Sequence, residues 1–448
     1  MIHEYDAIVI GSGPAGQAVI SECHSSGLRL AMVEARELGG TCPLRGCDPK
    51  KVLVGAAEII RRAQGLAEKG IQSQNKIQWP DLIRFKKTFT DPIPAEMEKR
   101  LAEYGVDLYR GRARFAERNR LQVGENTLMG KHIVIATGAV PRKLDIPGEE
   151  WIASSDQFLD LETLPDSIVF IGGGYISFEF AHIAVQAGVR AVIVHRSARP
   201  LKNFDPDLVG LLIEALEVAG VKVHLNMPVI SVEKTQKGLV VRAGEKGQHS
   251  FDCQLAVHGA GRVPDLESLG LKEGGVAVSS RGVLVNEHLQ SISNPAVYAA
   301  GDAAATPFFL TPTANLDGKI AARNILSGNT ARADYSGVPS VVFTFPPLAA
   351  VGLGEEELKK KDLEVECKFA DTSSWFETRR IGLERSGMKL FIGKNSGKLL
   401  GAHLLGNHAE EVINVFALAV RLGLTTEDLK RMPWAYPSSV SEIGYLVG

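Results

Sequence analysis

The sequence predicts an α/β fold, because one strand–turn–helix–strand pattern occurs twice along its 448 residues. The first copy opens with an apolar strand and a glycine-rich turn at residues 6–16, and the second opens in the same way at residues 167–177. Both copies continue as a helix, break at a glycine (Gly27 and Gly188), and enter a second apolar strand. Two repeats of this kind predict two Rossmann-type domains, each built on a parallel sheet.

The first turn has the full G-x-G-x-x-G spacing of a dinucleotide site. Gly11, Gly13 and Gly16 allow a tight turn and let a pyrophosphate approach the helix N-terminus, where Pro14 and Ala15 begin the helix. We therefore expect this turn to hold the phosphates of a dinucleotide.

The second turn departs from the pattern at one position. Gly172 and Gly174 match, whereas Ser177 stands where a third glycine or alanine is usual. The strand–helix–strand context around it still predicts a second dinucleotide site.

The residue that closes the second strand of each copy indicates the kind of ribose. In the first copy it is Glu34, and a carboxylate there suits an unphosphorylated ribose such as that of FAD or NAD. Glu34 lies 18 positions after Gly16, and the residue 18 positions after Ser177 is His195. The basic residues Arg196, Arg199 and Lys202 follow it. A 2′-phosphate needs cations and is repelled by a carboxylate, so the second copy predicts NADP rather than NAD.

A cysteine pair, Cys42 and Cys47, follows the first turn and precedes a helix predicted from about Pro49 through Leu66. Thiols held against a redox cofactor can make and break a disulfide by exchanging electrons with it. Backbone N–H groups at a helix start, and the basic side chains of Lys50 and Lys51, favour the thiolate. Two structural, buried cysteines are the alternative interpretation.

Two later strands end in small residues and fit a cofactor-binding protein. The segment 132–138 ends in Thr137-Gly138, and the segment 297–302 delivers Asp302 just past Gly301. A carboxylate in that place can accept hydrogen bonds from the polyol of a bound cofactor, although ordinary strand-to-loop turns would look the same.

The composition excludes several function classes. A formal net charge of −2 does not suggest a nucleic-acid partner, and no apolar run reaches the roughly 18 residues that span a membrane. Five cysteines are too few for a disulfide scaffold, and their spacing predicts no zinc site or other metal site. The chain begins almost directly with a strand, so we expect no signal peptide and a cytoplasmic location.

Together these motifs resemble the FAD-dependent pyridine nucleotide–disulfide oxidoreductases, a family that includes glutathione reductase, dihydrolipoamide dehydrogenase and mercuric reductase. The segment Gly-Gly-Thr-Cys42-x4-Cys47-x-Pro49 is similar to the redox-active disulfide motif of the family. The segments 261–264, 342–346 and 400–410 resemble the end of its nicotinamide domain and its C-terminal interface domain. The resemblance covers nearly the whole chain.

The resemblance implies an α/β fold with two Rossmann-type domains plus an α+β C-terminal dimerisation domain. It divides the chain into an FAD domain (1–147 and 265–336), an NAD(P) domain (148–264) and an interface domain (337–448). It implies a homodimer without membrane insertion, carrying FAD and using NADPH in preference to NADH.

The resemblance also implies the residues of the sites. The FAD-binding set is Gly11, Gly13, Pro14, Ala15, Gly16, Glu34, Gly40, Thr41, Lys51, Ala113, Thr137, Gly138, Gly301, Asp302, Leu310 and Thr311. The nicotinamide nucleotide-binding set is Gly172, Gly174, Tyr175, Ile176, Glu179, His195, Arg196, Lys202, Gly261 and Arg262. The catalytic set is Cys42, Cys47, Lys50, Lys51, Glu179, Tyr436 and Glu442.

The roles implied within the catalytic set follow the family. Cys47 is the sulfur next to the flavin, and Cys42 is the interchange thiol that attacks a substrate disulfide as a thiolate. One lysine of the pair Lys50 and Lys51 pairs with Glu179 beside the flavin, and the sequence leaves the choice open.

The C-terminal segment departs from the family. Its usual His-Pro-Thr-x-x-Glu is replaced by a segment with Tyr436 in the histidine position, Ser438 in the threonine position, and Glu442 one residue late. Tyrosine, with an ordinary pKa of about 10, is a poor base near neutral pH but can donate a proton.

Three functions therefore remain open from the sequence. The first is an NADPH-dependent reductase of a small disulfide, which the cysteine pair favours. The second is a flavin-dependent reductase of a quinone, a metal ion or another acceptor, which Tyr436 favours. The third is a redox sensor that signals to a partner through its flavin and cysteines.

Overall fold

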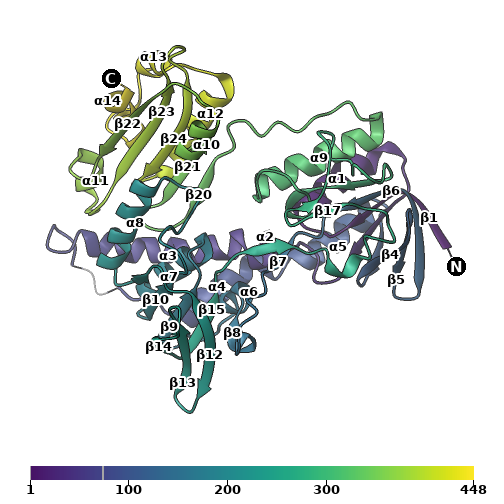
Figure 1. Cartoon of the computed structure of the whole chain (residues 1–448), viewed down its shortest axis with the longest axis horizontal. Coiled ribbons are helices and arrows are strands. Elements are labelled where there is room, and N and C mark those ends of the chain that lie inside the picture. The colour runs from purple at the N-terminus through teal and green to yellow at the C-terminus, as the bar shows by residue number, and fades with distance from the viewer. Residues whose placement is uncertain (1, 73–74, 448) are drawn as a thin grey trace. The chain divides into compact units, whose positions relative to one another are not determined.

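The structure is a computed structural model that describes residues 2–72 and 75–447. It divides into two compact units, which are described separately. The first unit contains the chain up to Lys50, Phe85–Arg142 and Arg262–Tyr335, and the second contains Lys51–Arg84, Lys143–Gly261 and the chain from Ser336. The predicted α/β fold is confirmed in both units (Figure 1).

The first unit is built on a seven-stranded sheet with the order β3-β2-β1-β6-β5-β4, in which β19 also pairs with β6. Strands β1, β2, β3, β6 and β19 pair in parallel, and β4 and β5 form an antiparallel extension. The strands are β1 (Ile2–Ile10), β2 (Leu30–Glu34), β3 (Asp107–Arg110), β4 (Ala113–Glu117), β5 (Arg120–Val123), β6 (Asn126–Ile135) and β19 (Val297–Ala299). Two further antiparallel sheets have two strands each: β7 (Ala139–Pro141) pairs with β16 (Arg262–Pro264), and β17 (Val278–Ser279) pairs with β18 (Gly282–Val283).

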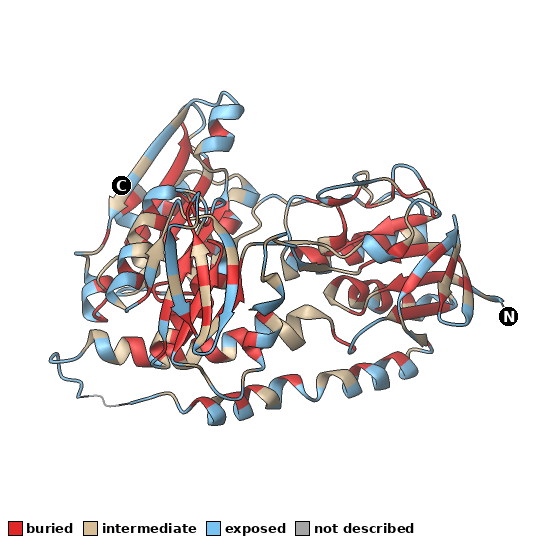
Figure 2. Ribbon diagram, turned by 60° about the horizontal axis from the view of Figure 1, so that its bottom comes forward, coloured by how far each residue is buried: buried red, intermediate tan, exposed pale blue. Residues whose placement is uncertain are grey.

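Three helices, α1 (Pro14–Cys23), α5 (Ile93–Glu103) and α9 (Thr311–Ser327), share one apolar core with the sheet of the first unit. The core forms because the apolar side chains of β1 and β2 meet those of the helices, for example Val9, Ile20 and Met97. Figure 2 shows the buried residues concentrated along the strands and on the inner faces of the helices.

The second repeat folds as the parallel sheet β11-β10-β9-β15-β8 of the second unit. Its elements are β8 (Ile152–Ala153), α6 (Ser155–Leu159), β9 (Ser167–Ile171), α7 (Tyr175–Gln186), β10 (Arg190–Val194), α8 (Pro206–Val218), β11 (Lys222–His224) and β15 (Leu255–His258). A three-stranded antiparallel sheet joins β12 (Val229–Thr235), β13 (Gly238–Ala243) and β14 (His249–Cys253).

The C-terminal part of the second unit is α+β, as predicted. Its antiparallel sheet has the order β20-β21-β24-β23-β22. The strands are β20 (Ser340–Val342), β21 (Leu348–Gly352), β22 (Val365–Asp371), β23 (Gly387–Gly393) and β24 (Leu399–Leu405). The helices are α10 (Glu355–Lys360), α11 (Phe376–Arg380), α12 (Ala409–Leu422), α13 (Thr426–Lys430) and α14 (Ile443–Val447).

The helix after the cysteine pair, α3 (Cys47–Gly65), begins two residues earlier than predicted. Cys47 is therefore its first residue rather than a residue of the preceding loop, and a short helix α2 (Thr41–Arg45) carries Cys42. The remaining helix is α4 (Trp79–Thr90). Among the residues that the structure describes, no helix is long and apolar enough to cross a membrane.

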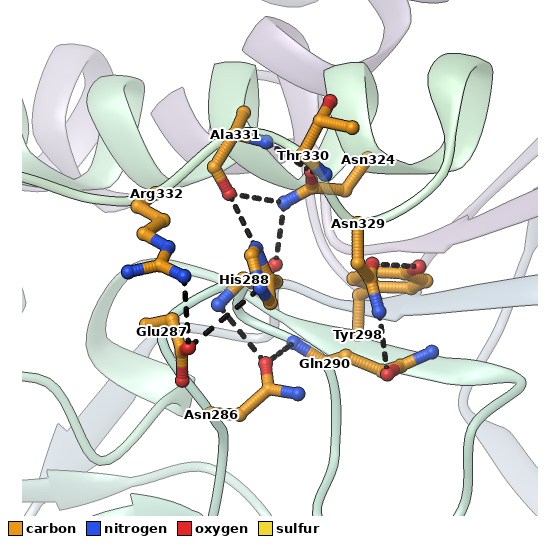
Figure 3. Close-up of polar contacts among 10 residues, drawn as sticks. All are labelled: Asn286, Glu287, His288, Gln290, Tyr298, Asn324, Asn329, Thr330, Ala331 and Arg332. Atoms are coloured by element: carbon orange, nitrogen blue, oxygen red, sulfur yellow. Dashed lines mark hydrogen bonds and ion pairs between the residues drawn. The ribbon is translucent and has the colours of Figure 1, made fainter.

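A polar network fixes the C-terminal end of α9 (Figure 3). The Asn324 side chain donates to the carbonyl oxygens of His288 and Ala331, both at 2.9 Å, and accepts from the backbone N–H groups of Thr330 and Ala331. Nδ1 of His288 lies 2.7 Å from the same Ala331 oxygen.

Candidate redox and nucleotide-binding sites

The two cysteines of the pair are free thiols that contact each other through a hydrogen bond. Sγ of Cys47 also lies 3.4 Å from Oγ1 of Thr311, the first residue of α9. The fold thus brings together the first residues of two helices, α3 and α9, that are far apart in the sequence.

The contacts assign different acidities to the two thiols. The hydrogen bond from Cys42 lowers the pKa of Cys47 to about 6, with help from Thr311 and the charge of Lys50, against the effect of burial. The same hydrogen bond, together with burial, raises the pKa of Cys42. The reduced pair therefore holds one proton near neutral pH, and the negative charge rests on Cys47.

The first glycine turn leaves its helix end open for an anion. Gly11 has a φ of +106°, and a Cβ there would lie 2.3 Å from the carbonyl oxygen of Ala136, so no other residue fits. Gly13 caps α1 without any side-chain hydrogen bond, which leaves N–H groups of the first turn available to a phosphate. Pro14 and Ala15 lie in that first turn, as predicted.

The carboxylate of Glu34 ties the end of β2 to this turn. It accepts from the backbone N–H of Ser12 at 2.9 Å and from the Ser12 hydroxyl at 2.6 Å. Gly40 caps α2, whose first residue is Thr41. Oγ1 of Thr137, another predicted cofactor ligand, is buried and has no hydrogen-bond partner among the described residues.

The predicted Asp302 has a second carboxylate, Asp317, near it. Asp302 lies in a short 3-10 turn after β19, where burial raises its pKa and the charge of Arg262 opposes that effect. Asp317 on α9 accepts from the backbone N–H of Gly301 at 3.1 Å and from the hydroxyl of Tyr335 at 2.7 Å. Burial raises the pKa of Asp317 to about 6.

Asp317 is a residue that sequence reasoning missed. The signal was a single carboxylate inside α9, a helix that packs its neighbours Ala314 and Ala321 into the core. Such a carboxylate needs hydrogen-bond donors, and here they are the backbone N–H of Gly301, next to Asp302, and the hydroxyl of Tyr335.

The structure also places four other predicted residues within the first unit. Leu310 is the N-cap of α9, Ala113 is buried in β4, and Arg262 lies in β16, where it donates to the carbonyl oxygen of Ala139. Gly138 follows β6 with a φ of +72°.

The second glycine turn is built like the first. Gly172 has a φ of +118°, and a Cβ there would lie 2.3 Å from the carbonyl oxygen of Gly259. Gly174 caps α7 without a side-chain hydrogen bond, and the next two residues, Tyr175 and Ile176, begin the helix. Gly261 follows with a φ of +111°.

The serine in the third position is accommodated by a glycine on the facing segment. Oγ of Ser177 is buried and has no hydrogen-bond partner among the described residues. A Cβ on Gly259 would lie 2.0 Å from this oxygen. The missing side chain at Gly259 therefore provides the space that a glycine at position 177 would have provided.

The basic residues after β10 differ in their partners. Nε2 of His195 lies 2.9 Å from the Ser197 hydroxyl, and burial lowers the pKa of His195, so the ring is neutral at pH 7. Arg199 forms an ion pair with Glu356, which neutralises it. Arg196 and Lys202 are exposed and make no ion pair within the part of the chain that the structure describes. These two residues, and not Arg199, carry free charge for a phosphate.

Glu179 lies fully buried in α7 and accepts from the backbone N–H of Phe343 at 2.7 Å. The ammonium of Lys51 lies over the ring of the same Phe343, 4.2 Å from its centroid. The structure thus gathers Lys51 and Glu179 around one residue of the C-terminal part, and the choice between Lys50 and Lys51 as the partner of Glu179 stays a prediction.

Tyr436 and Glu442 are not bonded to each other. Tyr436 has 77% of its surface exposed and makes no hydrogen bond among the described residues. Glu442 is buried and accepts from the backbone N–H of Glu377 at 3.3 Å. Burial raises the pKa of Glu442 to about 7.

Comparisons with known proteins agree with this geometry. Residues 5–322 match the model of the pyridine nucleotide-disulphide oxidoreductase family, and residues 338–446 match the dimerisation domain of the same family. The chain belongs to this family. The family expected from the sequence is therefore confirmed.

Several relatives match over almost the whole chain. A mercuric reductase from Staphylococcus aureus is 33% identical over 95% of this chain and 79% of its own length. A glutathione reductase from Nostoc sp. is 30% identical over 99% of both chains. A solved structure, the Cu(II) complex of the HOCl-induced flavoprotein disulfide reductase RclA from Escherichia coli, superposes with a TM-score of 0.89 at 25% identity over 99% of both chains.

Membership defines the reaction in outline. The protein is an NAD(P)H-dependent flavoprotein oxidoreductase that transfers electrons through FAD to a redox-active disulfide. The residues present fit both nucleotides, because the N-caps Gly13 and Gly174 make no side-chain hydrogen bond to the first turns of α1 and α7, and because the Thr137 hydroxyl is buried without a partner among the described residues. When bound, FAD accepts a hydride and releases the two electrons to a disulfide.

Proposed function

We propose that this protein is an NADPH-dependent reductase of a small disulfide and that it works as a homodimer. The observation that carries the proposal is the contact between the two thiols at the start of α3, with Oγ1 of Thr311 3.4 Å from Sγ of Cys47, because these contacts favour a thiolate on Cys47 and a proton on Cys42. The dimerisation domain supports the homodimer, and the names of the glutathione reductase and RclA relatives support a disulfide substrate.

In the proposed cycle, two electrons and one proton, which together are the equivalent of the hydride of NADPH, cleave the Cys42–Cys47 disulfide and leave a thiolate on Cys47 and a thiol on Cys42. Cys42 loses its proton and attacks one sulfur of the substrate disulfide, which forms a mixed disulfide and releases one substrate thiolate. Cys47 then attacks Sγ of Cys42, which releases the second thiolate and restores the Cys42–Cys47 disulfide. Two protons convert the two thiolates to thiols, so that NADPH, one proton and the disulfide yield NADP⁺ and two thiols.

Three further parts of the proposal concern the nucleotide, the protons and the lysine. Arg196 and Lys202 bind the 2′-phosphate of NADPH, because their charges are free and no carboxylate stands at position 195. Tyr436 donates a proton to the leaving thiolate in the other subunit, which its exposure in one chain would permit. Lys50 or Lys51 pairs with Glu179 beside the flavin.

We also propose the domain division 1–147, 148–264, 265–336 and 337–448 and a cytosolic location. The free thiols of the buried Cys23 and Cys253 support a reducing compartment.

Stopped-flow oxidation of the NADPH-reduced enzyme tests the proposal. We expect small disulfides to oxidise the reduced wild-type enzyme. The Cys42→Ser variant should still be reduced by NADPH, but disulfides should not reoxidise it. The Cys47→Ser variant should lack the thiolate that the wild-type enzyme carries at position 47. Cys367→Ser is the control, because this exposed cysteine lies on β22, outside the pair. Disulfide reduction at the wild-type rate by both Cys42→Ser and Cys47→Ser would refute the proposal.

A second candidate function is the reduction of a quinone or a metal ion. The observation that favours it is Tyr436 in place of the expected histidine. In this case quinones or metal ions would oxidise the reduced enzyme faster than any disulfide in the same experiment.

A further inference from the structure

A cavity of about 230 Å³ in the first unit is lined by residues of α1, α5 and α9 and by Met32 of β2. None of its lining residues belongs to the predicted FAD set or to the cysteine pair. Gln17, which lines one end, donates to the carbonyl oxygens of Ser12 at 3.0 Å and Gly39 at 3.3 Å. This side chain therefore stands between the cavity and the nucleotide turn.

The floor of the cavity is apolar and adaptable. Ile20, Met32, Met97 and Leu101 are all buried and belong to the core of the first unit. Two methionines are unbranched and polarisable, so they can follow the shape of a flexible aliphatic chain. The volume is below the roughly 300–1,000 Å³ of pockets for drug-sized ligands, which indicates a small ligand.

The rim is positively charged. Arg100 of α5 and Lys319 of α9 line the cavity, and neither makes an ion pair or a side-chain hydrogen bond within the residues that the structure describes. Three acidic residues on α1 and α5 are already paired with other cations. These pairs are Glu22 with Arg323 at 3.6 Å, Glu98 with Arg110 at 2.9 Å, and Glu103 with Lys99 at 3.9 Å.

We propose that this cavity binds a small amphipathic carboxylate, such as a medium-chain fatty acid. Its aliphatic chain would lie on the methionine floor, and its carboxylate would lie between Arg100 and Lys319, with polar contacts available from Asn315 and Tyr104. An apolar floor with unpaired cations at its mouth is complementary to this ligand class and to no neutral or cationic analogue.

Octanoate is the probe, and the FAD-loaded protein is titrated so that the nucleotide site is already filled. The methyl groups of Met32 and Met97, labelled with carbon-13, report binding locally by NMR. We expect saturable shifts of these two methyl signals with octanoate, and much weaker binding of octanol and octylamine, which keep the chain but lack the negative charge.

Charge variants test the rim. Because ion pairs at an exposed rim are worth about 0.2–1 kcal/mol, Arg100→Gln and Lys319→Gln should each weaken octanoate binding roughly 1.5- to 5-fold. Lys99→Gln is the matched control, since it removes a charge from the same helix outside the cavity and should leave the affinity unchanged. The proposal is wrong if octanol binds as tightly as octanoate, if neither methyl signal shifts, or if the Arg100→Gln/Lys319→Gln double variant binds like wild type.

Discussion

The substitution Thr311→Val tests how the fold sets the acidity of Cys47. The hydroxyl of Thr311 lies 3.4 Å from Sγ of Cys47 and lowers its pKa, while valine keeps the shape of the side chain and removes the donor. Thr311 also forms a side-chain hydrogen bond with Cys42 and lowers the pKa of that thiol, so the assay has to isolate the signal of Cys47.

The expected size follows from the energy of one hydrogen bond to a charge. Such bonds contribute about 1.5–3 kcal/mol, and a contact to sulfur as long as 3.4 Å belongs at or below the lower end, at about 1–1.5 kcal/mol. Since one pKa unit corresponds to about 1.36 kcal/mol, the pKa of Cys47 should rise by about one unit. At pH 6 the thiolate fraction should then fall from about a half to about a tenth.

The assay is the ultraviolet absorbance of the thiolate, followed against pH in protein that has been reduced and desalted under nitrogen. Subtraction of the Cys47→Ser signal isolates Cys47. The other cysteines do not interfere near pH 6, because burial raises the pKa of Cys23 and Cys253 to about 11 and also raises that of Cys367. Thr311→Ser, which restores the hydroxyl, should titrate like wild type.

Two results would refute this reasoning. A wild-type midpoint near 9, the pKa of a thiol without such contacts, would show that the contacts do not stabilise the Cys47 thiolate. Equal midpoints for Thr311→Val and wild type would show that Thr311 contributes nothing.

Four further substitutions probe other residues. Arg196→Ala should raise KM for NADPH roughly 10- to 150-fold and leave KM for NADH nearly unchanged. Arg199→Ala should change neither KM, because Glu356 already neutralises Arg199. Steady-state kinetics with both nucleotides measure these effects. Tyr436→Phe should slow substrate reduction by about 10²–10⁴-fold and leave flavin reduction by NADPH unchanged, and wild-type turnover with the best acceptor would make Tyr436 a structural residue. Burial raises the pKa of Glu442 from 4.5 to about 7, so the folded state holds a proton that the unfolded state has lost in this window, and stability should fall as pH rises from about 4.5 to about 7. Glu442→Gln should remove this slope in urea unfolding at several pH values, and an unchanged slope would contradict the assignment.

Local sequence patterns were sufficient for the fold and for the nucleotide turns. A glycine turn between a strand and a helix is specified by a few adjacent residues, and Gly11 and Gly172 have the left-handed φ values that require glycine. The two repeats therefore predicted two parallel sheets, and the chain forms them at the expected strands. The cysteine pair was likewise visible from its spacing alone.

The tertiary structure decided which side chains act on these local motifs. Thr311 reaches Cys47 across 264 positions, and Glu356 neutralises Arg199 across 157 positions, so no spacing rule could have found either contact. The family resemblance already selected Arg196 and Lys202 without Arg199, and the ion pair between Arg199 and Glu356 adds a physical reason for that selection. The buried Asp317 likewise accepts a hydrogen bond from the backbone N–H of Gly301, 16 positions away, and no spacing rule predicts this contact either.

The physical reason is the range of the interactions. Backbone conformation and hydrophobic periodicity depend on neighbours within a few residues, so the sequence by itself determined the elements, the glycine turns and the position of the thiols. The acidity of a thiol and the free charge of an arginine depend on polar groups within a few ångströms in space. Those groups come from segments that are distant in the sequence. The packing of α9 on α1, and of the C-terminal strands on the rest of the second unit, brings them close to the thiol and the arginine.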